Sequence, residues 1–313
     1  AAFTWAQEPI TKTMKLEFSE YDSNWNVKQK IPYNVQNCPM APHDFCWSSD
    51  YYGFFENSMS FDLTQFLMGA KGPAQVLVQN LAKPCKLHFV SRTKDGASFQ
   101  VHVPDFFCIH NSARMVQQDE STTLTIFSSG WDLADERYYP KEKSKVPFLG
   151  SWGGEYPNFD VIPPSTLFRT VVDKTTKQLV DHSKVIAGLN FEHPHIDPRD
   201  PTVIYGPCSN TVGLSTAPSG YCRVDTKTNT IQTWWTETRV FTEEVVVVPK
   251  RNPETNEPRD ECWLLGVLHD AQENRSSLAI VDGDDLEKGP VCRIHLKHPL
   301  AYSLHGTFAP NKI

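Results

Sequence analysis

The chain has 313 residues, with 30 Lys and Arg against 37 Asp and Glu, so its formal net charge of -7 is small for its length. Nucleic-acid binding leaves a basic stripe or patch, and no local run of this sequence supplies one. Hydrophobic residues make up 39% and aromatic residues 12%, enough apolar surface to order the chain. The longest aliphatic run, residues 245–248, is far shorter than the roughly 20 residues of a membrane-spanning helix. Nucleic-acid binding, disorder and helical membrane insertion are therefore excluded.

Strand patterns dominate, and no segment of twelve or more residues has helical periodicity, so the sequence predicts an all-β fold. Residues 87–90 and 99–103 flank the turn Lys94-Asp95-Gly96, which favours a hairpin. Residues 244–248 have the pattern of a strand covered on both faces, and residues 291–297 alternate like a half-buried strand. The Pro-rich, charged residues 250–261 are expected to form a loop or insertion.

A repeat appears when the turns are aligned. The segment VDKTTKQL (172–179) matches VDTKTNTI (224–231) nearly position for position, and looser strand–Asp–turn–strand copies begin at Tyr21-Asp22 and Val281-Asp282. A period near 50 residues with several short strands per unit is typical of propeller blades. The alternative is ordinary turn chemistry in an antiparallel meander.

Eight cysteines are scattered singly, with no Cys-x-x-Cys pair, which favours reduced thiols in an intracellular protein. Cys108 and Cys292 lie in apolar strand patterns and are expected to be small core residues. The chain begins at Ala1 without an initiator Met or a signal-peptide pattern, so we expect a fragment or a processed product.

Three of the eleven histidines share a strand-like, apolar context: His43, His110 and His305. A buried imidazole needs a partner, so each is either a hydrogen-bonded core residue or a metal ligand. In a propeller, inner strands of different blades converge on the axis, which would bring all three together; imidazole ligands suit iron, copper or zinc. His193 and His195, on either side of Pro194, have the spacing of a metal pair, but Pro194 and Pro198 place both in an irregular segment, so we expect two exposed loop residues instead.

Two glutamates lie in strand patterns where a carboxylate is costly, Glu192 and Glu244. Histidine ligands normally donate their free ring N–H to such a group, which fixes the tautomer. Each glutamate is therefore either a partner of a metal-binding histidine or a member of a salt bridge at the rim.

At these positions the sequence resembles the carotenoid cleavage oxygenase family, over nearly the whole chain. The C-terminal strands carry the most specific match, in order and spacing. The matching motifs are PHDF (42–45), VPDFFCIH (103–110), FEHPHIDPR (191–199), CWLL (262–265), SLAIVD (277–282), GPVCRIHL (289–296) and HGTF (305–308).

The resemblance implies a seven-bladed β-propeller that uses Fe(II) and dioxygen. His43, His110 and His305 match the second, third and fourth iron-binding histidines of the family. Glu192 and Glu244 match two of its three outer glutamates, which pairs Glu192 with His110 and Glu244 with His305. No histidine precedes His43, so we expect residues 1–313 to be a single propeller domain whose first part lies outside this chain.

The resemblance thus predicts an Fe(II)-dependent dioxygenase that cleaves a conjugated double bond of a carotenoid or apocarotenoid with O2 into aldehyde or ketone products. Stilbenoid cleavage, retinoid isomerisation and a non-catalytic propeller scaffold remain alternatives. The expected partners are an apolar polyene and O2, with room for a peripheral membrane contact, and neither nucleic acid nor an obligate protein partner. The choice between plastid and cytosol stays open.

Overall fold

The computed structural model describes residues 1–8, 11, 13–38, 40–72, 74–93, 96–117, 121–148, 161–211, 213–302 and 305–308. Strands account for most of these residues, and every strand pair within the sheets is antiparallel, which confirms the all-β prediction. In the described part, no helix is long and apolar enough to cross a membrane; α1 spans Leu63–Leu67. The short 3-10 helices are η1 (Ala74–Val76) and η4 (Leu286–Lys288).

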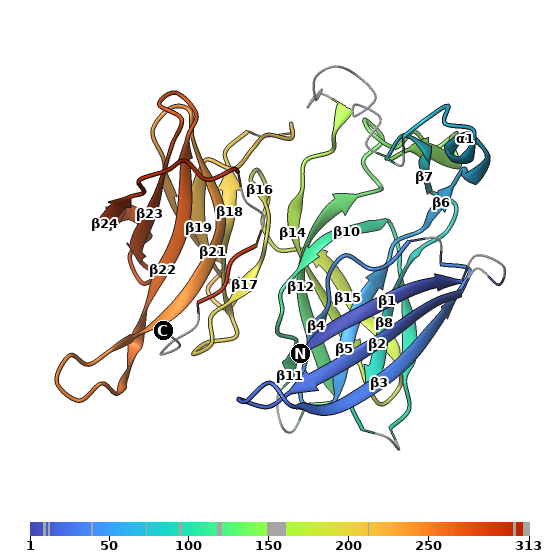
Figure 1. Ribbon diagram of the computed structural model, residues 1–313, viewed down its shortest axis with the longest axis horizontal. Coiled ribbons are helices and arrows are strands. Elements are labelled where there is room, and N and C mark those ends of the chain that lie inside the picture. The colour runs from blue at the N-terminus through green and yellow to red at the C-terminus, as the bar shows by residue number, and fades with distance from the viewer. Residues whose placement is uncertain are drawn as a thin grey trace.

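Five sheets among the described residues have the form of propeller blades, each an antiparallel meander (Figure 1). The first contains β1 (Ala2–Glu8), β2 (Thr13–Tyr21) and β3 (Val27–Gln36). The second contains β4 (Cys46–Trp47), β5 (Tyr51–Glu56), β8 (Cys85–Ser91) and β9 (Phe99–Val103). The third contains β10 (Phe106–Asn111), β11 (Val116–Gln117), β12 (Thr123–Asp132), β14 (Thr166–Asp173) and β15 (Gln178–Lys184).

The last two blade sheets form the other side of the molecule in Figure 1. The fourth contains β16 (Asn190–Phe191), β17 (His195–Ile196), β18 (Val203–Ser209), β19 (Gly220–Asp225) and β20 (Thr230–Trp235). The fifth contains β21 (Val240–Arg251), β22 (Pro258–Asp270), β23 (Arg275–Asp282) and β24 (Pro290–His295). A small extra sheet pairs β6 (Met59–Phe61), β7 (Leu77–Asn80) and β13 (Lys145–Pro147) beside α1.

The hydrophobic core lies between consecutive blade sheets rather than inside one of them. Phe18 of β2 stacks on Tyr52 of β5, with ring centroids 4.6 Å apart, and the same face-to-face packing recurs at each following junction. Val245 and Leu264 of the fifth sheet, for example, share a cluster with Tyr205 of the fourth. Because each of the three middle sheets packs one face on the sheet before it and the other on the sheet after it, the blades stand side by side in chain order.

The predicted repeat joins the last two strands of four blade sheets. Asp173 Oδ1 accepts hydrogen bonds from the backbone N–H groups of the turn between β14 and β15, and Asp225 does the same between β19 and β20. Asp22 and Asp282 hold the corresponding positions after β2 and β23. In the two closest copies, Lys177 and Asn229 both have a φ of 57°, so the same turn geometry recurs.

Several sequence predictions need correction. Of residues 250–261, only 252–257 form a loop: β21 continues to Arg251 and β22 begins at Pro258, so the rest of the stretch is paired in one long hairpin. Cys292 is exposed rather than a core residue, because β24 is the outer strand of its sheet and nothing covers its outer face among the described residues. Cys108 is buried as predicted.

Other strand predictions are confirmed in part. β8 and β9 pair as the predicted hairpin, whereas Lys94 and Asp95 of its turn lie outside the described residues. In β21, Val245 and Val247 are buried, but Val246 and Val248 are only half-buried.

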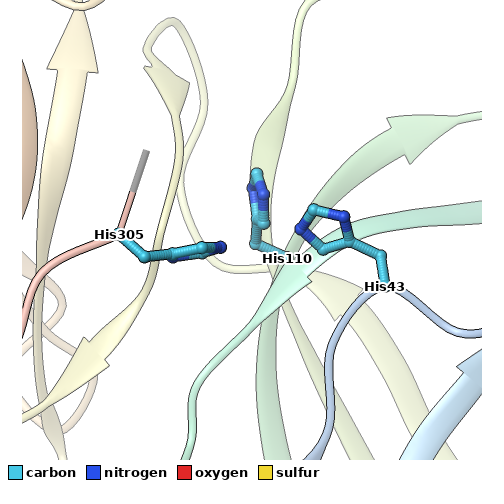
Figure 2. Close-up of side chains that lie close together, drawn as sticks. All are labelled: His43, His110 and His305. Atoms are coloured by element: carbon cyan, nitrogen blue, oxygen red, sulfur yellow. The ribbon is translucent and has the colours of Figure 1, made fainter. Parts of the chain in front are cut away.

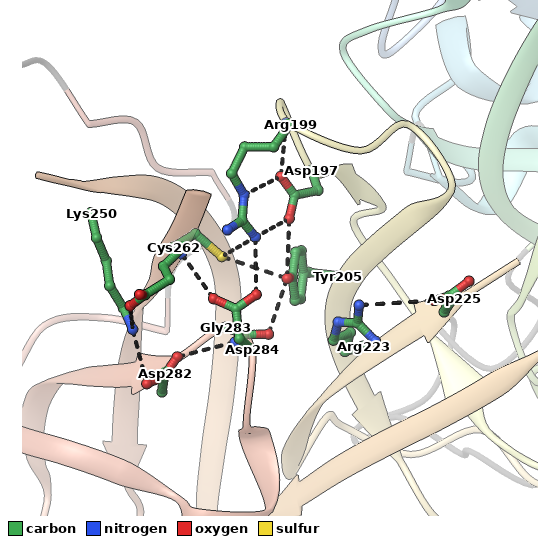
Figure 3. A network of polar contacts seen from close by, with 11 residues as sticks. Asp197, Arg199, Tyr205, Arg223, Asp225, Lys250, Cys262, Asp282, Gly283 and Asp284 are labelled. Carbon is green, nitrogen blue, oxygen red and sulfur yellow. Dashed lines mark hydrogen bonds and ion pairs between the residues drawn. The ribbon is translucent and has the colours of Figure 1, made fainter. Parts of the chain in front are cut away.

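A polar network links the fourth and fifth sheets, and we call it the Arg199 junction (Figure 3). Its members from the fourth sheet and its loops are Asp197, Arg199 and Tyr205, and those from the fifth are Cys262 and Asp284. Arg199 donates to both oxygens of Asp197 at 2.9 and 2.5 Å, and also reaches Cys262 Sγ at 3.2 Å and Asp284 at 3.3 Å. Burial alone would raise the pKa of Asp197, but the Arg199 guanidinium holds it below its usual value.

Candidate metal centre

Three histidines from distant parts of the sequence point toward one another in Figure 2. His43 lies in the loop before β4, His110 is on β10, and His305 is in the segment after β24. Their ring centroids are 4.8 to 5.9 Å apart, and one ring nitrogen from each lies within 4.8 Å of the others. His110 is buried, whereas His43 and His305 are exposed. The residues expected from the sequence are therefore brought together.

A β-bulge aims His110 at this point. The pairing of β10 with β12 shifts between Cys108 and His110, so Ile109 has no partner in the ladder. Such bulges bend a strand and redirect a side chain. The backbone N–H of Asn111 then donates to Asp44 Oδ2 at 3.0 Å, which ties the loop that carries His43 to the strand that carries His110.

Each of two histidines has a carboxylate behind it, in the pairs expected from the resemblance. Glu192 Oε2 lies 3.0 Å from Nδ1 of His110 and also accepts a hydrogen bond from Ser129 at 2.9 Å. Glu244 Oε2 lies 3.3 Å from Nδ1 of His305 and accepts from the backbone N–H of Gly306 at 2.7 Å. Because an ionised carboxylate only accepts, Nδ1 of His110 carries the proton of its hydrogen bond and Nε2 keeps its lone pair, whereas Glu244 lies at ion-pair distance from Nδ1 of His305.

Local strand geometry and charge explain how carboxylates can be accommodated at Glu192 and Glu244. Glu244 lies where the pairing of β21 with β22 shifts between Thr242 and Val245, so it is outside the regular ladder. Burial alone would raise the pKa of Glu192, but its hydrogen bond to His110 brings that pKa below the ordinary value. Glu192 is therefore ionised at neutral pH.

A fourth histidine joins the site, and the sequence prediction for it was wrong. His193 is half-buried rather than an exposed loop residue, and its ring centroid lies 3.9 Å from that of His110 and 5.1 Å from that of His305. His195 is also half-buried, in β17. The sequence did carry one signal, the spacing of a metal pair in His193-Pro194-His195. We call His43, His110, His193 and His305 the histidine cluster.

The surroundings of His43 and His193 favour the neutral form of both rings. Burial, followed by the neighbouring His110, lowers the pKa of His43, and the same two causes lower the pKa of His193 to about 3. A neutral imidazole is the form that binds a metal, whereas an imidazolium is repelled by one. At neutral pH the ring nitrogens of His43 and His193 are thus available as ligands.

The donor set fits a divalent transition metal. Nitrogen ligands sit about 2 Å from such an ion, so opposite ligands are about 4 Å apart, which is compatible with the ring nitrogens of His43, His110 and His305 lying within 4.8 Å of one another. Imidazoles suit iron, copper and zinc, and the carboxylates behind His110 and His305 are the usual outer partners of histidine ligands. The residues therefore fit the iron site that the resemblance implies.

An open, largely apolar pocket lies beside His305. It measures about 330 Å³, and its polar side chains are those of Glu243, Glu244, His305 and Thr307. The apolar part is formed by Val246, Leu265, Val267, Leu278 and Phe308. An elongated apolar molecule placed there would lie against aliphatic and aromatic side chains with one part next to the histidine cluster.

Comparison with known proteins gives the family. Residues 2–310 match the model of the family described as retinal pigment epithelial membrane protein. The apocarotenoid-15,15'-oxygenase of Synechocystis is 24% identical over 273 residues, which cover 85% of this chain and 51% of that protein. The 9-cis-epoxycarotenoid dioxygenase NCED6 of Arabidopsis thaliana is 22% identical over 286 residues, 86% of this chain and 43% of that protein. The chain thus spans about half the length of these curated relatives.

Solved structures agree on the fold. A mutant Synechocystis apocarotenoid oxygenase superposes with a TM-score of 0.79 at 20% identity, covering 98% of this chain and 60% of that one. The cobalt-substituted enzyme gives the same values. The likeness confirms the propeller prediction. The chain belongs to the retinal pigment epithelial membrane protein family, the carotenoid cleavage oxygenases that its motifs indicated.

Proposed function

We propose that this chain carries the iron site of an oxygenase that cleaves a conjugated double bond of a carotenoid or apocarotenoid with O2, giving aldehyde or ketone products. The observation that supports this most strongly is the convergence of His43, His110 and His305 on one point, with a carboxylate behind two of them. The names of the two long relatives, an apocarotenoid oxygenase and an epoxycarotenoid dioxygenase, supply the substrate class.

In this proposal His43, His110 and His305 hold iron(II), which when bound supplies the activation of dioxygen. The protein itself orients the histidine rings and excludes water from the site. Glu192 and Glu244 fix the rings of His110 and His305 so that Nε2 faces the ion, and Ser129 and the Gly306 N–H hold those carboxylates in place. No general base is assigned, because neither the substrate nor the products require a proton to be removed by a side chain.

The pocket beside His305 is the proposed binding surface for the polyene. Its side chains Val246, Leu265 and Phe308 offer apolar contacts without hydrogen-bond donors, which suits a hydrocarbon chain and not a charged ligand. Burial of a polyene there would also keep bulk water from the metal.

Smaller aromatic alkenes are a second candidate class. An isoeugenol monooxygenase of Pseudomonas nitroreducens is 36% identical over 77 residues, 25% of this chain. That local identity exceeds the identity to either long relative, and it favours testing a phenylpropanoid next to the polyenes.

Turnover by the iron-loaded protein tests the proposal. An apocarotenoid, an intact carotenoid and isoeugenol would each be incubated with the protein in air and under argon, and the carbonyl products identified by chromatography and mass spectrometry. We expect O2-dependent cleavage of a polyene that His305→Ala abolishes. A protein that binds iron but leaves all three compounds intact would contradict the proposal and favour the scaffold alternative.

A further inference from the structure

The histidine cluster contains one more imidazole than the proposed ligand set uses. His193 lies between β16 and β17, and one ligand atom each from His193, Glu244 and His305 lie within 4.8 Å of one another. Its ring is also the nearest of all to His110, at 3.9 Å between centroids. In the motif FEHPHIDPR (191–199), the proposed function gives a role to Glu192 but none to His193.

We propose that His193 is itself a metal ligand. His305 lies close both to His193 and to the pair His43 and His110, so His193 would be the fourth imidazole ligand that this chain supplies. The inference rests on the proposed function, since it requires that the cluster bind a divalent transition metal. It concerns affinity and coordination number rather than substrate.

The hydrogen bonding of His193 supports ligation. Its side chain is half-buried, yet it forms no hydrogen bond with any described residue, whereas His110 and His305 each have a carboxylate partner. Its ring nitrogens are therefore not committed to a protein partner, and a metal ion in the cluster could take one of them as a ligand.

The backbone gives independent support. His193 has a φ of 44°, in the left-handed region that side chains other than glycine seldom adopt. The preceding residue is anchored, because Glu192 N–H donates to the Pro207 carbonyl at 3.1 Å while its side chain holds His110. Strained residues persist where the surroundings fix them, and they gather at functional sites. Here the unusual conformation turns the ring into the cluster.

A packing role is the rival explanation. The rings of His193 and His110 are tilted by 31° at 3.9 Å, so they contact each other as two aromatic rings would. Phenylalanine would preserve that contact but cannot bind a metal, and glycine would suit the positive φ while removing the ring. These two substitutions therefore separate ligation from packing.

The experiment is titration of the metal-free protein with cobalt(II), followed by its visible absorption, for the wild type, His193→Phe and His193→Gly. His195→Phe, two residues along the same segment, is the matched control. We expect both His193 variants to bind cobalt at least about tenfold more weakly, as losses around a metal site do, with a changed band intensity. Free imidazole should restore the affinity of His193→Gly, and His195→Phe should titrate like the wild type.

Three outcomes decide the matter. Weakened binding in both His193 variants, with rescue of the glycine variant by imidazole, supports ligation. Unchanged affinity and spectrum in His193→Phe overturn it and leave His193 a packing residue, while the proposed iron site stands. A wild-type protein that binds no cobalt overturns both. Thermal unfolding of each metal-free variant separates loss of the ligand from loss of the fold.

Discussion

The histidine cluster and the Arg199 junction are two ways in which the same propeller brings polar residues of different sheets together. In the junction, Arg199 and Asp197 are paired twice, and the remaining donors reach Cys262 and Asp284. In the cluster, His43 and His193 form no hydrogen bond with any described residue. A polar group whose partners are all supplied by the protein stabilises a joint, whereas one left open is available to a ligand.

We therefore expect mutations in the two regions to have different effects: loss of metal binding in one and loss of folding stability in the other. Breaking the cluster should cost metal and activity with little cost in folding, because two of its members are exposed. Breaking the junction should do the reverse, because Asp197 is 1% exposed and its charge depends on Arg199.

Removal of His305 should have the largest effect on activity. His305→Ala deletes a proposed ligand whose side chain is 50% exposed, so we expect turnover below detection and loss of bound iron, with an unchanged melting temperature of the metal-free protein. Elemental analysis measures the bound iron, and calorimetry measures the melting temperature. His295→Ala, on the exposed face of β24, is the control and should keep both metal and activity. Full iron occupancy in His305→Ala would remove His305 from the ligand set.

Removal of Arg199 should have the largest effect on stability. Arg199→Ala leaves the buried Asp197 carboxylate without its partner, and we expect the free energy of unfolding to fall by about 3 kcal/mol. The iron affinity should stay at the wild-type value. Urea denaturation checks the first expectation, and Arg169→Ala, which breaks an exposed pair with Asp181, should cost at most about 1 kcal/mol. Equal losses in both variants would show that the junction is no more than a surface ion pair.

Neutralising Glu192 should have an intermediate effect. Glu192→Gln keeps the size of the side chain but removes the charge that fixes Nδ1–H of His110, so we expect about 10- to 100-fold weaker iron binding. Competition with a metal chelator measures the affinity. Glu237→Gln, in an exposed pair with Arg293, is the matched control. An unaltered affinity in Glu192→Gln would mean that His110 needs no carboxylate behind it.

The mildest test of the comparison is acidification. The pKa values of His43 and His193 are lowered, so protons compete with the metal only below the ordinary histidine pKa of about 6.5. The pKa of Asp197 is also lowered, so the stability that this carboxylate adds is fully present above its ordinary pKa, near 3.8, and is lost as the pH falls through the lower value of the folded state. We therefore expect cobalt release, seen by absorption, at a higher pH than disruption of the junction. Loss of cobalt and of the near-UV circular dichroism signal at the same pH would contradict the expectation that the two regions respond to acid separately.

Much of the site could be predicted from sequence because its motifs are local. His43, His110 and His305 each lie in a short apolar pattern that stands out without knowledge of their contacts, and Glu192 and Glu244 are conspicuous as carboxylates in strands. The Asp turns at Asp173 and Asp225 likewise reveal the blade repeat, since a two-residue hydrogen-bonding pattern needs no long-range information.

The remainder depends on contacts between distant segments. The position of His193 follows from a left-handed backbone that its sequence context, an x-Pro step, does not favour. The exposure of Cys292 depends on β24 being the outermost strand, which an alternating pattern does not reveal. The Arg199 junction joins two sheets through side chains that, in sequence, resemble ordinary loop charges.

The central claim is that the histidine cluster binds iron. Elemental analysis of the protein purified without oxygen, together with His110→Ala prepared in the same way, tests it most directly. We predict iron equimolar with the wild-type chain and none in His110→Ala, whose fold should persist by circular dichroism. A wild-type protein that stays free of iron after anaerobic reconstitution would contradict the account, and the four imidazoles would then have to be explained as packing within a propeller that has kept the family's fold without its metal.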